Sequence, residues 1–168
     1  MKIETKRLLI KPLDENEMRN YILNDFVLES SLKLENHSRV VPDRVKKAIE
    51  TKVLPNLTDQ SKNNLYYTFW VVISKEQNKL VAEMCFKGEP NERGELEIGY
   101  ATYPDFQLNG FMTEAISGLV NWAFQEENIN TILAETDLNN IASIRVLEKN
   151  NFTLESQTKN NCFWRLSK

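Results

Sequence analysis

The sequence predicts an α/β protein with a mixed sheet of about six to seven strands flanked by about four helices. Three observations support this fold class. Segments with helical spacing of apolar residues are separated by short runs rich in aromatic and β-branched residues, three of these runs follow one another, and the second half of the chain alternates strand and helix. With 168 residues, 41% of them apolar, the chain is predicted to form one domain over residues 1–168.

The first half of the chain begins with a predicted strand, Thr5–Leu13, which contains three consecutive apolar residues. A helix is predicted to start at Asp14, because Asp14 and Glu17 have the spacing of a capping box. Apolar residues recur every four positions within Val41–Leu54, so a second helix is predicted there, closed by Pro55.

The remaining predicted elements follow from the same two patterns. Met112, Ile116 and Leu119 belong to one apolar face of the helix with the clearest periodicity. In chain order these elements are the strands Leu65–Ser74, Lys79–Phe86 and Glu95–Tyr103, the helix from about Gly110 to Glu127, the strand Thr131–Thr136, the helix Asn140–Asn150, and the strands Thr153–Thr158 and Cys162–Leu166.

The charge of the chain argues against several kinds of partner. There are 21 Lys and Arg against 24 Asp and Glu, so no general attraction to nucleic acid or to an anionic membrane is expected. The first residues are charged where a signal peptide has an apolar segment, and no run of about 18 apolar residues occurs. We therefore expect a cytoplasmic protein, monomeric or homodimeric, that binds neither nucleic acid nor membrane.

The two cysteines and the single histidine do not suggest a metal site or a covalent nucleophile. Cys85 and Cys162 lie in apolar runs, away from the motifs described next, and are interpreted as core thiols. His37 has polar neighbours and is interpreted as a loop residue. No metal ligand set is predicted.

The most informative segment joins a predicted strand to the clearest helix through a loop that contains Gln107 and Gly110. Backbone N–H groups at a helix N-terminus have no acceptor within the helix and carry partial positive charge, which favours a bound phosphate or pyrophosphate. Many such turns also hold a glycine for conformational reasons alone. The loop by itself is compatible with an anion site or with a simple turn.

Several ordered motifs give the chain a recognisable pattern. They are Glu97-Ile-Gly-Tyr100, Gln107-x-x-Gly110, Asn140-x-x-Ser143 and Leu147-Glu-Lys-x-x-Phe152, with Thr5-Lys-Arg-Leu-Leu-Ile-Lys-Pro12 at the start. In these motifs the chain resembles the GNAT N-acetyltransferases, and within them the Rim-like branch of ribosomal-protein acetyltransferases. The resemblance extends over nearly the whole chain.

The resemblance implies a GNAT-like, mostly antiparallel mixed sheet and a site for acetyl-CoA as co-substrate. The loop backbone would cradle the pyrophosphate, and the end of the preceding strand would pair with the pantetheine arm. Asn140 would hydrogen-bond the same arm, although local sequence also explains it as a helix N-cap. The implied cofactor-binding residues are Tyr100, Ala101, Thr102, Gln107, Leu108, Asn109, Gly110, Phe111, Met112, Thr113, Asn140 and Ser143.

Four positions depart from the family pattern. Met112 stands where a small residue is usual, so its side chain is expected on the apolar face of the helix, away from the cofactor. Asn109 stands where relatives often carry a cation, which removes one charge from the phosphate loop. Asn151 replaces a glycine at a helix end, where asparagine tolerates the favoured left-handed geometry. Leu147 replaces the tyrosine that protonates the leaving thiolate in many members, which leaves Ser143 as the implied acid.

The implied reaction moves an acetyl group from acetyl-CoA to a primary amine by direct attack, without a covalent enzyme intermediate. The amine must first lose a proton, because the ordinary pKa of a lysine side chain is about 10.4. Glu97 is the candidate base, although strand alternation also explains it as a solvent-facing residue. A backbone N–H near Thr102 is the candidate donor to the oxyanion.

Two functions are therefore considered. The first is an acetyl-CoA-dependent N-acetyltransferase, and the alternative is a non-catalytic acyl-CoA-binding or sensor module. The residues at 112 and 147 favour the alternative, whereas the presence of Glu97 and Ser143 favours the enzyme. The acceptor is expected to be a small-molecule or peptide amine; ribosomal-protein N-termini, polyamines, aminoglycosides and amino-acid-like toxins all fit this description.

Overall fold

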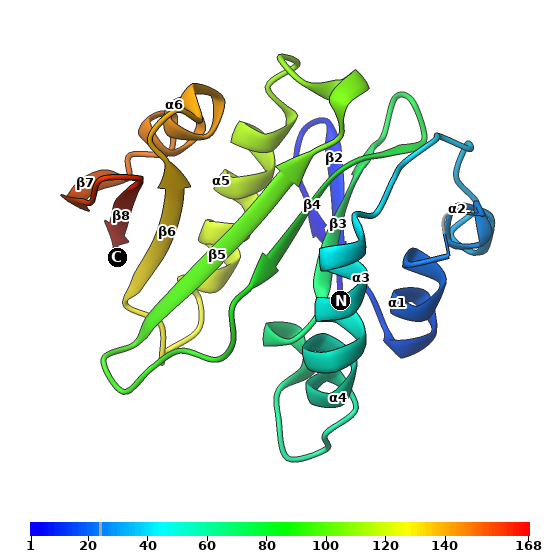
Figure 1. Ribbon diagram of the computed structural model, residues 1–168, viewed down its shortest axis with the longest axis horizontal. Helices are drawn as coiled ribbons and strands as arrows, with labels where there is room; N and C mark the ends of the chain where they lie inside the picture. Colours follow the sequence, from blue (N-terminus) through cyan, green and yellow to red (C-terminus); the bar gives the residue numbers. More distant parts are fainter. Residues whose placement is uncertain (24) are drawn as a thin grey trace.

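The centre of the structure, a computed structural model that describes residues 1–23 and 25–168, is one sheet. Its strands are β1 (Ile3–Glu4), β2 (Leu8–Pro12), β3 (Phe69–Ser74), β4 (Lys79–Phe86), β5 (Glu95–Thr102), β6 (Thr131–Asp137), β7 (Thr153–Gln157) and β8 (Asn161–Ser167). Within the described residues they lie in the order β1-β2-β3-β4-β5-β6-β8-β7 (Figure 1). All neighbours are antiparallel except β5 and β6, which are parallel. The predicted mixed, mostly antiparallel sheet is confirmed, with eight strands instead of six or seven.

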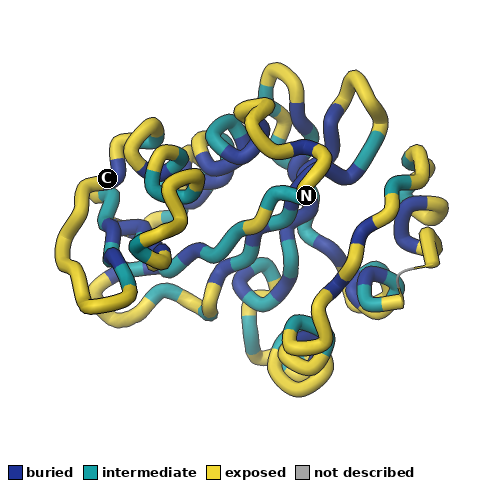
Figure 2. Tube along the Cα trace, turned by 45° about the horizontal axis from the view of Figure 1, so that its top comes forward, coloured by how far each residue is buried: buried dark blue, intermediate teal, exposed yellow. Residues whose placement is uncertain are grey.

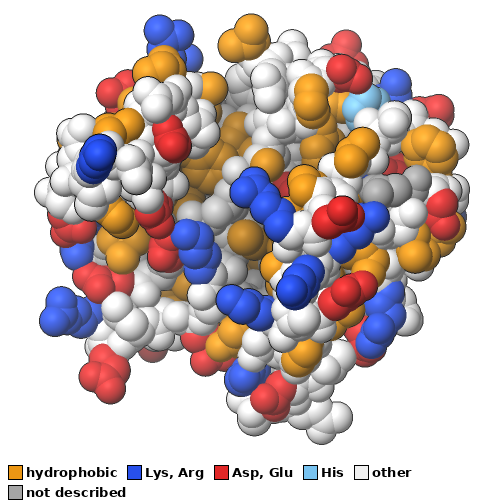
Figure 3. Space-filling view, in the orientation of Figure 1, with side chains coloured by type: hydrophobic (Ala, Val, Ile, Leu, Met, Phe, Trp, Pro, Cys, Tyr) orange, Lys and Arg blue, Asp and Glu red, His pale blue; other side chains and the backbone are white. Residues whose placement is uncertain are grey.

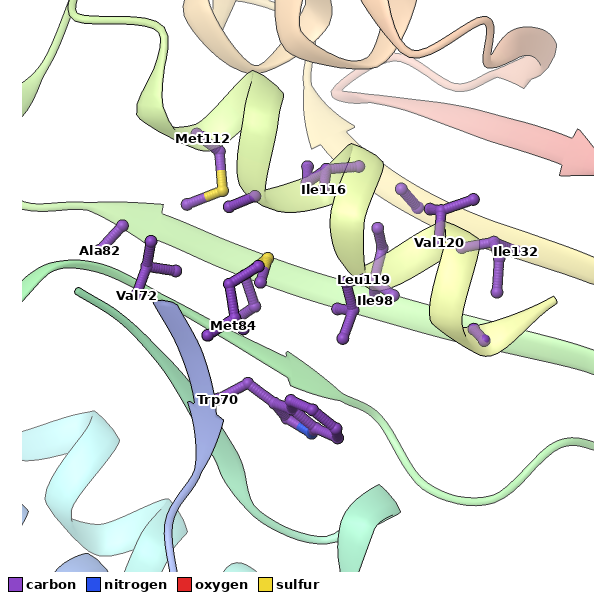
Figure 4. Packing of buried hydrophobic residues seen from close by; sticks show 14 of the residues in the cluster. Trp70, Val72, Ala82, Met84, Ile98, Met112, Ile116, Leu119, Val120 and Ile132 are labelled. Atoms are coloured by element: carbon purple, nitrogen blue, oxygen red, sulfur yellow. The ribbon is translucent and has the colours of Figure 1, made fainter. Parts of the chain in front are cut away.

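One face of the sheet is covered by α5 (Phe111–Ala123), the helix with the clearest sequence periodicity. Its buried side chains, among them Met112 and Ile116, point to the strands and pack with Trp70 and Met84 (Figure 4). Burying such a side chain contributes about 1.5–3 kcal/mol, so this interface is a principal source of stability. The helix also approaches the N-terminal segment closely. A Cβ added at Gly118 would lie only 2.9 Å from Cγ2 of Thr5, so a larger residue there would force a shift.

In the described part of the chain, the opposite face is covered over β2–β4 by four short helices: α1 (Glu15–Tyr21), α2 (Val27–Ser31), α3 (Asp43–Ala48) and α4 (Leu54–Leu57) (Figure 1). The predicted capping box is present, since Asp14 accepts from the Glu17 N–H and the Glu17 side chain accepts from the Asp14 N–H. The helix α2 was not predicted from the sequence. Its five residues are too few for a periodic pattern to stand out.

The single helix predicted over Val41–Leu54 is wrong in its details. The segment is divided into α3, a π-helical turn η1 (Ile49–Val53) and α4, and Pro55 lies inside α4 instead of closing the helix. In the wide turn the Leu54 N–H bonds the Ile49 carbonyl. Pro55 is then in the first turn of a new helix, where a missing N–H costs nothing.

The C-terminal part contains α6 (Ile141–Lys149), which packs beside α5. Asn151 follows the helix with a φ of 61°, the left-handed geometry predicted for it. Short 3₁₀ turns occur at η2 (Asn64–Tyr66) and η3 (Pro104–Phe106), and the first of these overlaps the start of the strand predicted over Leu65–Ser74. The strands at the centre are buried, whereas loops and outer helix turns are exposed (Figure 2). No helix in the described part of the chain is long and apolar enough to cross a membrane.

Candidate active site

The candidate site begins where β5 and β6 separate. Residues Glu95–Ile98 of β5 pair with Thr131–Ala134 of β6, and the pairing ends there. The strand β5 continues beside β4 as far as Thr102. Main-chain groups of successive strand residues point to opposite neighbours, and the bonds Lys87 N–H to Glu97 O and Tyr103 N–H to Val81 O show that odd-numbered residues face β4. The main-chain groups of Tyr100 and Thr102 therefore face the gap. In the space-filling view a hollow opens here between β5 and β6, with hydrophobic side chains at its bottom and Lys and Arg side chains on its rim (Figure 3).

The loop before α5 presents a row of free backbone donors beside this gap. Leu108 and Gly110 have positive φ values of 62° and 74°, and within the described residues the N–H groups of residues 108–113 have no hydrogen-bond acceptor. Such a row at a helix N-terminus can bind a phosphate or pyrophosphate. The Met112 side chain is 5% exposed and packs in the core, as predicted, so only its main chain belongs to the loop surface.

Arg7, which was not predicted as a site residue, holds this loop from the N-terminal segment. Arg7 Nε donates to Glu114 Oε2 (2.6 Å), and Nη1 donates to the Asn109 carbonyl (3.0 Å). Thr5 Oγ1 also donates to Glu114 (2.6 Å). The only sequence signal was the opening motif Thr5-Lys-Arg, which does not reveal that its partners lie in the first turn of α5.

Two hydroxyl groups meet at the N-terminus of α6. Ser143 Oγ donates to Tyr100 Oη (2.8 Å), and Tyr100 Oη lies 3.2 Å from the Ser143 carbonyl. Burial raises the pKa of Tyr100 to about 12, so this phenol stays protonated at neutral pH. Leu147, which offers no acid, is fully buried in the core. Proton donors at this end of the gap are thus hydroxyls from β5 and α6.

Asn140 acts as a helix cap in the structure. Its Oδ1 accepts from the Ser143 N–H (3.0 Å), which is the local explanation considered from the sequence. The side-chain NH₂ group has no acceptor in the described part of the chain and is exposed. Capping and hydrogen bonding to a ligand are therefore compatible at this residue.

A group of carboxylates lies on the face of β5 opposite α5. Glu97 Oε1 accepts from Lys87 Nζ, and Glu135 Oε2 lies 3.9 Å from the same ammonium. Glu97 is paired across the sheet with Leu133, near the end of regular β5–β6 pairing. The second oxygen of the Glu97 carboxylate has no partner among the described residues, so it is free to accept a proton or a ligand.

Another carboxylate on this face, Glu83, lies level with the gap in strand register. It pairs across β4 and β5 with Ala101 and accepts hydrogen bonds from Tyr21 Oη and Tyr103 Oη, the latter at 2.9 Å. Burial raises the pKa of Glu83 above its ordinary value, and the Tyr21 hydrogen bond opposes that shift. Glu83 is therefore the carboxylate nearest in register to the unpaired strand edge.

Cys85 is closer to the motifs than the sequence suggested. It pairs with Gly99 of the Glu-Ile-Gly-Tyr motif, and its Sγ would lie 3.4 Å from a Cβ at that glycine. The expectation of separation is wrong because it was judged along the chain, whereas antiparallel pairing places β4 beside β5. Burial raises the pKa of the Cys85 thiol to about 11, which keeps it protonated and a poor nucleophile.

Solved structures with this fold match nearly the whole chain. A RimL ribosomal L7/L12 alpha-N-protein acetyltransferase in complex with coenzyme A has a TM-score of 0.72 at 16% identity, with 99% of this chain and 98% of that chain covered. A ribosomal-protein-S5-alanine acetyltransferase from Vibrio fischeri has a TM-score of 0.71 at 17% identity, with 99% and 96% covered. At these identities the similarity shows the fold alone.

Curated relatives and a family match give the sequence-level comparison. The uncharacterized N-acetyltransferase YjdG of Bacillus subtilis (strain 168) is 33% identical over 95 residues, 56% of each protein, so this chain spans little more than half of that relative's length. The uncharacterized N-acetyltransferase YnaD of the same strain is 26% identical over 149 residues, 89% of this chain and 81% of YnaD. The acetyltransferase (GNAT) domain family matches residues 7–153. Because this match covers most of its length, the chain belongs to the GNAT acetyltransferase family.

Proposed function

We propose that this protein is an N-acetyltransferase that moves an acetyl group from acetyl-CoA to a primary amine by direct attack. The observation that carries the proposal is the meeting of three features at one gap. The unpaired edge of β5 runs from the free N–H donors of residues 108–113, past the Tyr100–Ser143 hydroxyl pair, to the face that carries Glu83 and Glu97. In the proposed reaction these three features would serve cofactor binding, proton donation and proton acceptance.

The residues present fit acetyl-CoA, which when bound supplies the acetyl thioester. The N–H groups of residues 108–113 would hold the pyrophosphate, since they have no acceptor in the described structure. The main-chain groups of Tyr100 and Thr102 would hold the amides of the pantetheine arm as a neighbouring strand does. The Thr102 N–H is our candidate to stabilise the oxyanion that forms on attack.

Glu97 is our candidate for the base that takes the proton of the incoming ammonium. Its free carboxylate oxygen lies on the side of the sheet that the N-terminal helices leave open, while Lys87 holds the other oxygen. A peptide or small-molecule amine would approach from this side. The N-terminal α-amine of a protein, the acceptor named for the RimL structure, belongs in the first panel of test substrates.

Ser143 is our candidate for the acid that protonates the departing thiolate. The chain offers no tyrosine at position 147, and the Leu147 that stands there is fully buried. The Ser143 hydroxyl is instead positioned by its hydrogen bond to Tyr100 Oη, and after giving its proton to the thiolate it would take one back from solvent. A non-catalytic acyl-CoA-binding module is the second candidate, favoured by Leu147. Release of free CoA with an amine panel separates the two functions.

Acetyl-CoA is expected to raise the melting temperature of the protein. Ligand at about 100 times its dissociation constant stabilises the folded state by about 2.7 kcal/mol, which corresponds to a rise of roughly 5–10 °C for a chain of this size. NAD and ATP are expected to shift the transition much less. Differential scanning fluorimetry over a concentration series measures this effect. The absence of a shift at millimolar acetyl-CoA would contradict the cofactor assignment.

Replacing Ser143 by alanine is expected to lower kcat by at least about 10-fold while leaving the affinity for acetyl-CoA nearly unchanged. The reason is that the hydroxyl acts on the leaving thiolate, whereas the N–H of residue 143 still reaches the Asn140 cap. Steady-state kinetics and calorimetric titration measure the two quantities. Tyr100→Phe removes the partner hydroxyl and serves as the comparison, with a smaller expected effect. An equal loss of affinity and rate in Ser143→Ala would make Ser143 a cofactor ligand or a cap.

A further inference from the structure

The loop proposed to hold the pyrophosphate carries no cation of its own. Residues 104–123 contain no Lys or Arg. They include Glu114 in the first turn of α5, and the negative charge of this carboxylate would repel a phosphate bound at the loop. The N–H groups contribute only partial charge. Any full positive charge at the loop therefore comes from another element.

Arg7 supplies this charge from the segment before β2. Its guanidinium lies over the Phe111 ring at 5.0 Å from the centroid, and two of its nitrogens bond Glu114 and the Asn109 carbonyl. The third nitrogen, Nη2, has no acceptor in the described part of the chain and lies 3.5 Å from the position of a Cβ on Gly110. The side chain is 44% exposed, so a ligand has access to it.

We propose that Arg7 is a pyrophosphate-binding residue of the acetyl-CoA site, an inference that rests on the proposed function. Two of its nitrogens fix the loop and neutralise Glu114, and Nη2 donates to a phosphate oxygen above Gly110. This arrangement replaces the loop cation that is absent at Asn109. It also gives the N-terminal motif a role in ligand binding, beyond its packing against α5.

Substitutions at the two ends of the ion pair separate binding from mere fixation of the loop. Arg7→Gln leaves the Glu114 charge unpaired beside the phosphate and is expected to weaken CoA binding by about 10-fold or more, with Arg7→Lys intermediate. Glu114→Gln leaves Arg7 free and is expected to bind CoA at least as tightly as the wild type. A purely structural strap would weaken binding in both variants.

Calorimetric titration with CoA, 3′-dephospho-CoA and S-acetylpantetheine measures these differences on the full chain. The loss in Arg7→Gln should be the same for CoA and 3′-dephospho-CoA and should vanish for S-acetylpantetheine, which has no pyrophosphate. Lys75→Met is the control, because Lys75 Nζ pins the same segment through Glu4 and the Thr5 carbonyl (3.0 and 2.9 Å) without contacting the loop. This variant should bind CoA like the wild type.

The possible failures are distinguishable. If the wild type does not bind CoA, the proposed function is wrong, whatever Arg7 does. If the wild type binds and Arg7→Gln stays within about threefold of it, Arg7 is not a phosphate ligand. Equal losses in Arg7→Gln and Glu114→Gln would make the pair structural, and a loss seen with CoA but not with 3′-dephospho-CoA would overturn the assignment to the pyrophosphate.

Discussion

Replacing Gly110 by valine is expected to abolish the stabilisation by acetyl-CoA while leaving the protein folded. Gly110 has a φ of 74°, which costs an L-residue roughly 1–2 kcal/mol and costs a β-branched residue more. The loop would have to leave this conformation, and its row of N–H groups would no longer converge. The melting temperature without ligand should fall by roughly 2–8 °C, and the ligand-dependent rise should be lost.

The variant Gly110→Asn separates two reasons for a glycine at this position: its positive φ and the close approach of a ligand to its backbone. Asparagine tolerates positive φ, as Asn151 and Asn78 do in this structure, but it adds a Cβ. That Cβ meets no backbone or core atom in the protein, since its nearest neighbour is Arg7 Nη2. If the backbone must approach the pyrophosphate, Gly110→Asn also loses the thermal shift. A wild-type shift in both variants would contradict the role of this loop in cofactor binding.

Features that depend on neighbouring residues could be predicted from the sequence. The capping box at Asp14, the buried face of α5 with Met112, and the left-handed Asn151 were all predicted and are confirmed. Each is determined by side chains within one or two turns of one another, so local spacing contains the information. The same holds for the order of the main strands and of α5 and α6, and hence for the fold class.

The π-helical turn η1 shows how a local repeat of apolar residues can predict the wrong kind of helix. Val41, Val45, Ile49 and Val53 repeat every four residues, and on an α-helix such a repeat drifts by about 40° per step. The wide turn η1 absorbs an extra residue and brings the later apolar side chains back towards the sheet. A strict four-residue spacing predicts an ordinary helix, because nothing in the spacing marks where the wide turn lies.

Long-range features of the site could not be predicted locally. Arg7 and Glu114 are 107 residues apart, and the end of β5–β6 pairing at Ile98 depends on the register of two strands that are separated by α5. The contact of Cys85 with Gly99 likewise arises only when β4 folds beside β5. Family resemblance implies cofactor-binding residues in the loop, but it implies no role for the N-terminal arginine.

Replacing Glu97 by glutamine is expected to lower kcat/KM by about 10²–10⁴-fold near neutral pH, and progressively less as pH rises. The reason is that an amine already deprotonated by the solvent no longer needs a carboxylate. Glutamine keeps the size of the side chain, so the fold and the thermal shift with acetyl-CoA should survive. The measurement is a pH–rate profile of the variant and the wild type with the same amine.

Glu135→Gln is the matched control, because it removes the same charge from the same face and beside the same Lys87. A small effect there with a large effect at Glu97 would exclude a general loss of negative potential. A loss below about threefold in Glu97→Gln would make Glu97 a polar strand residue only. A large loss that does not change with pH would indicate that its charge positions the acceptor.

The variant Glu83→Gln distinguishes Glu83 from Glu97 as the base that takes the proton of the incoming ammonium. Burial raises the pKa of Glu83, which makes its carboxylate a stronger base. Activity that depends on the ionised Glu83 carboxylate should therefore rise with pH through that raised pKa. If Glu83 is the base, the acid limb of the wild-type kcat/KM profile lies above the ordinary carboxylate range and disappears in Glu83→Gln. If Glu97 is the base, Glu83→Gln leaves the pH–rate profile as it is in the wild type, and the two tyrosine hydroxyls at Glu83 serve only to order the acceptor face.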